Sequence, residues 1–144
     1  LYEKELLGTG GGLLNAKDYL KGDFFLHNAD VLSEIDLLAL YKDHQKNRNL
    51  ATLAVMKRET KRALLFDDSM QLTGWSNDGV TGNRYGFCGV QVLSDEIFRF
   101  LESPGSTIDA FLRAANAGKR VVGVDIGERF WADVGTPEKL LRFA

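Results

Sequence analysis

Residues 24–32 read FFLHNADVL, an apolar run that ends close to a single carboxylate, Asp30. Near the other end of the chain, residues 130–138 read FWADVGTPE and give Asp133 a similar position. The run FFLHN (24–28) is almost continuously apolar, which is typical of a buried parallel strand. Two carboxylates that each follow an apolar strand raise the question of whether they bind one ligand. The answer depends on the fold, which the remaining sequence pattern predicts.

That pattern alternates between strands and helices. Further strands are expected at 51–56, 63–66, 70–75, 84–93 and 120–126. Helices are expected at 12–21, after a capping Ser33 toward Tyr41, at 94–101, at 106–117, and from Thr136-Pro137 onward. The order predicts an α/β architecture around a mostly parallel sheet. Such sheets bind ligands beyond the C-terminal ends of their strands, which is where Asp30 is expected.

The composition limits the class of protein. The chain has 144 residues, 44% hydrophobic and 26% charged, as in an ordinary single globular domain. A net charge of −2 gives no support to a broad surface for nucleic acid or membrane. Cys88 is the single cysteine and cannot form an internal disulfide, so a reducing, cytoplasmic location is expected.

Asn28, Asp30 and Asp133 are the first candidates for a site. Alternate residues of a strand share a face, so Asn28 and Asp30 are expected to point the same way at the strand end. Carboxylates there could hold Mg²⁺, a hard cation that prefers oxygen ligands and keeps several waters. The alternatives are that Asp30 caps a turn or the next helix, and that Asp133 lies in a loop before a capping Thr136.

The segment LGTGGG at residues 7–12 is a further candidate. A glycine run just before a helix lets backbone N–H groups approach a ligand closely, and a helix start favours negative charge. The segment matches neither GxGxxG nor GxxxxGK[ST], so its pattern alone identifies no phosphate-binding loop. A flexible turn between a strand and a helix is the alternative.

Other polar residues point to structure more than to chemistry. His27 is expected to face away from Asp30, and His44 is expected at the polar end of a helix. Cys88 lies in an apolar strand, where a buried, inert thiol is usual. A basic cluster could meet phosphates, although a solvated loop is the simpler interpretation; it consists of Lys57, Arg58, Lys61 and Arg62.

Taken together, these segments resemble the sugar-phosphate nucleotidyltransferases, which join a nucleoside triphosphate and a sugar 1-phosphate to give a nucleotide sugar and pyrophosphate. The resemblance runs over nearly all of the chain. It rests on LLGTGGG (6–12), FLHNADV (25–31), GFCGVQVLSDEIF (86–98) and FWADVGTPEKL (130–140). The TGGG form is most similar to enzymes acting on N-acetylmuramate, mannose or heptose 1-phosphates, which implies a role in nucleotide-sugar biosynthesis for cell-envelope polysaccharide.

The resemblance implies a Rossmann-like (GT-A-like) fold, with a mostly parallel mixed sheet flanked by helices. It implies that Asp30 and Asp133 hold a catalytic Mg²⁺ and that Asn28 contacts the sugar or the ribose. The implied partners are a nucleoside triphosphate and a sugar 1-phosphate, without nucleic acid or membrane, and a homo-oligomer is left open. Four residues are implied to contact the nucleotide base: Gly8, Thr9, Gly10 and Gly11.

The chain also departs from the family pattern. Family members begin with a strand and a glycine-rich loop that ends in Arg and is followed by Lys, and no such loop occurs here. Residues 1–144 are therefore expected to be the C-terminal part of a nucleotidyltransferase domain, about two-thirds of it, that lacks its N-terminal portion and leaves a central strand without a neighbour. The alternatives are a non-catalytic nucleotide- or sugar-phosphate-binding module, an inactive fragment, and a GT-A-type glycosyltransferase.

Overall fold

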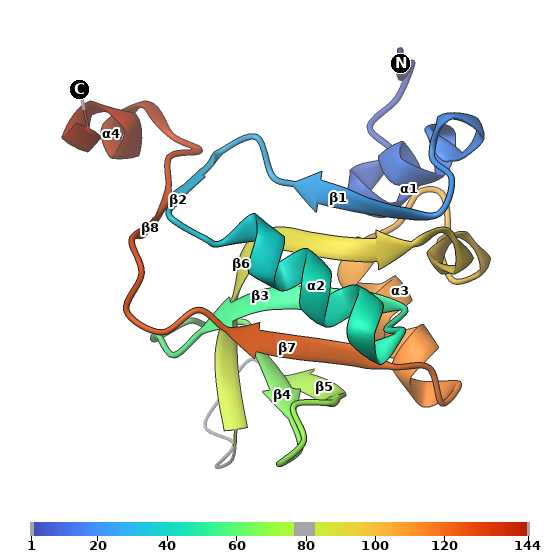
Figure 1. The fold of residues 1–144 in the computed structure, drawn as a ribbon. Helices are drawn as coiled ribbons and strands as arrows, with labels where there is room; N and C mark the ends of the chain where they lie inside the picture. The colour runs from blue at the N-terminus through green and yellow to red at the C-terminus, as the bar shows by residue number, and fades with distance from the viewer. Residues whose placement is uncertain (1, 77–82, 144) are drawn as a thin grey trace.

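A computed structural model describes residues 2–76 and 83–143 and shows a sheet with helices on both faces (Figure 1). The helices are α1 (Gly8–Asn15), α2 (Leu37–Asn47), α3 (Thr107–Asn116) and α4 (Pro137–Leu140), with 3₁₀ helices η1 (Lys17–Tyr19), η2 (Asp95–Arg99) and η3 (Leu141–Phe143). The strands are β1 (Asp23–His27), β2 (Val31–Ser33), β3 (Ala51–Met56), β4 (Ala63–Phe66), β5 (Leu72–Ser76), β6 (Asn83–Ser94), β7 (Val121–Asp125) and β8 (Trp131–Asp133). None of the helices in these residues is long and apolar enough to cross a bilayer.

The main sheet confirms the α/β class but corrects the expected strand directions. Within the described residues its order is β5–β4–β6–β3–β7, with β1 also paired to β6. Only β3 and β7 pair in parallel, and every other pairing in this sheet is antiparallel, so "mostly parallel" is wrong for these strands. The long strand β6 runs against β1 and β3 and lies between them. Because β6 is buried on both faces, it has the continuous apolar character of a parallel strand whatever its direction.

The sheet separates two apolar cores. Alternate side chains of β3 point to opposite faces, so Leu53 packs in the core that contains Phe111 of α3, while Ala54 packs in the core that contains Leu40 of α2. Phe111 is fully buried, and such a side chain stabilises the fold by roughly 2–3 kcal/mol. Figure 1 shows α2 and α3 on opposite sides of the sheet.

Three helices differ from those expected. The helix expected at 12–21 is α1 at Gly8–Asn15, followed by the separate η1 at Lys17–Tyr19. Asp36, not Ser33, caps α2: its Oδ1 accepts a hydrogen bond from the Ala39 N–H at 2.9 Å, while Ser33 lies in β2. The segment predicted as a helix over 94–101 is the shorter η2, which begins after the capping Ser94. The segment before α2 carries two possible capping side chains, Ser33 and Asp36, and the local pattern does not say which one caps the helix.

Strand β1 has a neighbour on one side only. It pairs with β6 through residues 23–27, and no strand in the described part of the chain lies along its other edge. Phe25, in the middle of β1, is 43% exposed. The sequence predicts that a central strand lacks a neighbour, without saying which strand. An unpaired edge presents free N–H and C=O groups that can pair with another strand.

Candidate functional site

The structure brings Asp30 and Asp133 together, although the sequence separates them widely. Asp30 lies in a tight turn after β1, in which the Val31 N–H donates to the Asn28 carbonyl at 3.2 Å. Val31 then begins β2, which pairs with β8 so that Val31 is opposite Asp133. The Val134 N–H donates to the Asp30 carbonyl oxygen at 2.8 Å and extends this contact beyond the ladder. The short β2–β8 ladder therefore positions both carboxylates.

Gly135 shows how close the two side chains are. A Cβ atom placed on Gly135 would lie 2.7 Å from Asp30 Oδ2 and 3.2 Å from Asp133 Oδ1. Both distances start from one point, so the two oxygens are at most about 5.9 Å apart. The backbone N–H of Gly135 also donates to Asp133 Oδ1 at 2.9 Å. Any larger residue here would intrude between the carboxylates.

Asp133 is held in its charged form by its neighbours. The Lys139 ammonium lies 2.7 Å from Asp133 Oδ2 and donates a hydrogen bond to it. This bond, followed by the one from the Gly135 N–H, lowers the pKa of Asp133 below its ordinary value. The capping Thr136 and Pro137 at the first turn start α4 as expected, and the helix places Lys139 beside the carboxylate.

The donor set suits a magnesium ion that shares its shell with a ligand. Mg²⁺ is usually held by one or two carboxylates together with waters and substrate phosphates. Asp30 and Asp133 supply two carboxylates within reach of one ion, and no group of three or more His, Cys, Asp or Glu side chains gathers in residues 2–76 and 83–143. Lys139, as a cation already on Asp133, marks the place where positive charge is favoured. The metal role of the pair stays a prediction.

Arg58 is a neighbour of this pair that the sequence did not single out from its basic cluster. Its guanidinium carbon lies 4.4 Å from the centre of the Trp131 ring, and its Nη2 donates to the Phe87 carbonyl at 2.9 Å. A Cβ on Gly86 would lie 2.5 Å from Arg58 Nε, so the side chain lies tightly across that glycine. Arg58 is therefore fixed in place, not solvated in a loop. The sequence could have revealed this position of Arg58 only if it had shown that the Arg58 side chain packs on Gly86.

Arg58 and Lys139 line one cavity with Asp133. The cavity has a volume of about 350 Å³, and Trp131 and Arg142 also contribute to its wall. The cavity thus holds three cationic side chains and Asp133, while Asp30 is not part of its lining, and such a surface can receive phosphate groups.

Asn28 is exposed, but it does not share a strand face with Asp30 as expected. β1 ends at His27, and both residues lie in the following turn. The Asn28 N–H donates to the Gly89 carbonyl at 2.8 Å. Its side-chain Nδ2 lies 2.9 Å from the place of a Cβ on Gly89, whose φ of +72° also favours glycine. The structure therefore gives Asn28 a position over Gly89 and leaves its substrate role a prediction.

The glycine segment forms part of α1, not a turn before a helix. The Gly10 N–H donates to the Gly105 carbonyl at 2.8 Å, and a Cβ on Gly8 would lie 2.5 Å from that same oxygen. Thr9 Oγ1 accepts a hydrogen bond from the Thr107 N–H at 3.2 Å. Close packing against the start of α3 therefore requires these small residues. Figure 1 shows α1 on the side where β1 begins, whereas Asp30 follows the end of β1.

The remaining candidates are structural. Cys88 is fully buried, and burial raises the pKa of its thiol to about 12, in agreement with an inert thiol. His27 Nδ1 lies 2.7 Å from the Asn28 carbonyl oxygen. His44 was expected at the polar end of a helix, yet it is only 1% exposed and faces the sheet.

Comparison with known proteins gives this arrangement a context. No protein-family model matches the chain. The chain is 31% identical over 147 residues to a probable mannose-1-phosphate guanylyltransferase 2 of Oryza sativa subsp. japonica, a match that covers 94% of this chain and 40% of the relative. It is 30% identical over 141 residues to a probable glucose-1-phosphate cytidylyltransferase of Bacillus subtilis, covering 92% and 53% respectively. The chain thus spans about half, or less, of the length of these curated relatives.

Solved structures share the fold at low sequence identity. The UTP-bound UGPase from Acinetobacter baumannii superposes with a TM-score of 0.81 at 19% identity, covering 96% of this chain and 55% of that one. The inositol-1-phosphate CTP transferase from T. maritima gives a TM-score of 0.76 at 19% identity, covering 96% and 60%. Sequence similarity and shared fold together confirm the resemblance of this chain to the sugar-phosphate nucleotidyltransferases.

Proposed function

We propose that the protein containing this chain transfers a nucleotidyl group from a nucleoside triphosphate to a sugar 1-phosphate in a magnesium-dependent reaction. One observation carries the proposal: Asp30 and Asp133, from opposite ends of the chain, flank Gly135 at the end of the β2–β8 ladder. The names of the relatives support the same reaction class.

In the proposed reaction, an oxygen of the sugar 1-phosphate attacks the α-phosphorus of the nucleoside triphosphate. The bond from that phosphorus to the oxygen bridging the β-phosphorus breaks, and pyrophosphate leaves with the electron pair. Because the attacking oxygen is already anionic, no general base is needed. The demands on the protein are alignment of two mutually repelling substrates and neutralisation of their charge.

The residues of the site divide these tasks. Asp30 and Asp133 would hold Mg²⁺, which when bound supplies Lewis-acid and template chemistry to phosphates. Lys139 and Arg58 lie beside Asp133 and would bring positive charge to a phosphate oxygen. The exposed Asn28 would bond a sugar or ribose hydroxyl. A contact of the nucleotide base with Gly8, Thr9, Gly10 and Gly11 stays a prediction, because Gly10 and Gly11 are buried and the Gly10 N–H already donates to the Gly105 carbonyl.

The test is pyrophosphate release by the intact protein that contains this chain, across nucleoside triphosphates and sugar 1-phosphates. Asp30→Asn and Asp133→Asn each replace a carboxylate by an amide of the same shape. We expect either change to lower magnesium-dependent turnover by about a hundredfold or more, because both carboxylates are needed to place one ion. Asp18→Asn, at an exposed acid in η1, is the control and should leave the rate unchanged.

Near-normal turnover of Asp30→Asn or Asp133→Asn would contradict the metal assignment. Nucleotide binding without pyrophosphate release from any substrate pair would instead favour the non-catalytic binding module. Turnover of a nucleotide sugar with no pyrophosphate formed would favour a glycosyltransferase.

A further inference from the structure

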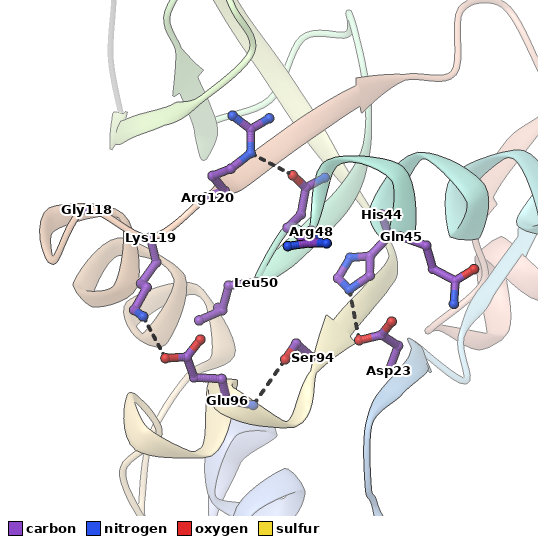
Figure 2. Close-up of a pocket in the computed structure, with 11 residues that line it drawn as sticks. Asp23, His44, Gln45, Arg48, Leu50, Ser94, Glu96, Gly118, Lys119 and Arg120 are labelled. Atoms are coloured by element: carbon purple, nitrogen blue, oxygen red, sulfur yellow. Dashed lines mark hydrogen bonds and ion pairs between the residues drawn. The ribbon is translucent and has the colours of Figure 1, made fainter.

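A second cavity lies at the opposite end of the sheet from Asp30 and Asp133. Its volume is about 500 Å³, and it opens where β1, β3 and β7 begin and β6 ends (Figure 2). Ligands of open α/β sheets normally bind beyond the C-terminal ends of the parallel strands. A cavity at the other end therefore does not belong to the proposed catalytic site, and its lining needs its own explanation.

Three basic side chains from two connections line this cavity: Arg48 follows α2, and Lys119 and Arg120 lie between α3 and β7. The Lys119 ammonium is neutralised by Glu96, whose Oε1 lies 2.6 Å away. The Arg120 guanidinium uses its Nε to donate to Asn49 Oδ1 at 3.1 Å, and its other nitrogens have no partner in residues 2–76 and 83–143. The Arg120 guanidinium thus has nitrogens without an acceptor in the described residues, and Figure 2 shows this group at the margin of the lining, away from Ser94 and Glu96.

Arg48 carries the second guanidinium group of the lining that has no partner in the described residues. Arg48 ends α2 in the left-handed conformation, with φ of 50°, and its backbone N–H caps the carbonyls of His44 and Gln45. The capping is done by the backbone, so the guanidinium is not consumed by it. Among the residues that the structure describes, no group pairs with this guanidinium, and Figure 2 shows it within the ring of lining residues.

A buried polar network forms the floor and fixes one further donor. Arg Nε can only donate, so Asn49 presents its oxygen to Arg120 and its Nδ2 to Thr52 Oγ1, 2.9 Å away. The fully buried Thr52 hydroxyl, which accepts from Asn49, also lies 2.9 Å from His44 Nδ1. A proton on His44 Nε2 is favoured by the Asp23 carboxylate oxygen 3.4 Å from it.

The His44 Nε2–H has no hydrogen-bond partner in the described residues, although the side chain is only 1% exposed. Its nearest acceptor is Asp23 Oδ1 at 3.4 Å, which is too long for a good hydrogen bond. Burial lowers the pKa of His44, against the opposing effects of Asp23 and Asp43, so the ring is neutral at neutral pH. A buried donor without an acceptor favours a ligand that can accept.

We propose that this cavity binds the phosphate group of a small phosphorylated metabolite between Arg48 and Arg120. Guanidinium forks match phosphate oxygens in pairs, and two forks suit a dianion. Glu96 is held by Lys119, and Asp23 keeps its charge beside the neutral His44, so the three basic and two acidic side chains of the lining leave a net positive charge. The size of the cavity is in the range of small-molecule sites. The proposal does not depend on the catalytic function.

The experiment is a nuclear magnetic resonance titration of the intact protein with inorganic phosphate and with glycerol phosphate, at constant ionic strength. Saturable shifts are expected at the Arg48 and Arg120 side chains and at the His44 ring, without equal shifts at Asp30. Tighter binding of the ester identifies a metabolite as the source of the phosphate, whereas binding of inorganic phosphate alone identifies the free ion. Either result supports the cavity as a phosphate site.

Two variants decide whether the cavity is responsible. Arg48→Asn keeps a residue that tolerates the left-handed conformation, and Arg120→Lys keeps the charge while removing the fork. Each should weaken phosphate binding about tenfold or more. Lys46→Gln removes one charge from the same helix end, outside the lining, and should change affinity less than about twofold. Absence of saturable shifts, or equal loss in Lys46→Gln and Arg48→Asn, would overturn the proposal.

Discussion

Gly135 determines how near the two carboxylates of the proposed site can come. An added Cβ would sit 2.7 Å from Asp30 Oδ2, closer than non-bonded atoms tolerate, so the absence of a side chain is what leaves room between Asp30 and Asp133. The Lys139 ammonium, by contrast, adds a charge to the same place. Single residues thus set both the spacing and the electrostatic balance of the pair.

Replacing Lys139 with Met is expected to raise the pKa of Asp133, because the ammonium hydrogen bond is the largest contribution that lowers it. A depressed folded-state pKa stabilises the fold above the unfolded-state pKa, and this effect is lost as pH falls through the folded-state value. The loss of unfolding free energy in the variant should therefore be largest near neutral pH and shrink below about pH 4. Both side chains are over 40% exposed, so we expect less than about 1 kcal/mol.

Carbon-13 titration of the Asp133 carboxyl group, together with urea unfolding at neutral and acidic pH, measures both effects. Lys42→Met, at an exposed lysine of α2, is the matched control and should leave the Asp133 titration in place. An unchanged Asp133 titration in the Lys139 variant would show that the ion pair does not form in solution.

The start of α3 shows how one element fixes another. Ser106 Oγ accepts from the Ile108 N–H at 3.1 Å, and Thr9 Oγ1, from α1, accepts from the Thr107 N–H at 3.2 Å. Two of the unpaired N–H groups at the helix start are therefore satisfied, one of them by another helix. The glycines of α1 permit this approach, so α1 and α3 pack as one unit.

Ser106→Ala is expected to lower the free energy of unfolding by about 1 kcal/mol, since it removes a capping acceptor from α3. Denaturant unfolding of the variant measures this loss directly. Ser106→Asn retains a good capping side chain and should recover most of the stability. If the Asn variant were as unstable as the Ala variant, the loss would come from packing around residue 106 instead of the cap.

For the molecule as a whole, local patterns predicted elements well and long-range pairing less well. The apolar run at 51–56 forms β3 with the expected bounds, and Thr136 caps the helix that it was expected to cap. These features depend on a few neighbouring residues. The direction of β6 was missed because burial on both faces looks the same for either direction.

The candidate site likewise contains residues that the sequence could identify and contacts that it could not. Asp30 and Asp133 could be selected from their motifs, but their contact depends on the three-residue ladder between β2 and β8, which is too short to leave a periodic signal. Arg58 and Lys139 could not be selected, since each reaches Asp133 or Trp131 only after the chain has folded. Contacts between side chains of separate segments therefore could not be predicted from the sequence and are seen only in the folded structure.

At the scale of the whole sheet, the edge of β1 that has no neighbouring strand in the described residues can be tested by hydrogen exchange. The Asn28 N–H donates to the Gly89 carbonyl across to β6, so the alternation of an antiparallel ladder turns the Leu26 N–H toward β6 and those of Phe25 and His27 away from it. In this chain, the Phe25 and His27 amides should exchange at least about tenfold faster than the Leu26 amide. Equal protection of all three would mean that another strand covers the edge. Protection that rises with protein concentration would identify that strand as part of a second copy, and either result would contradict an open edge.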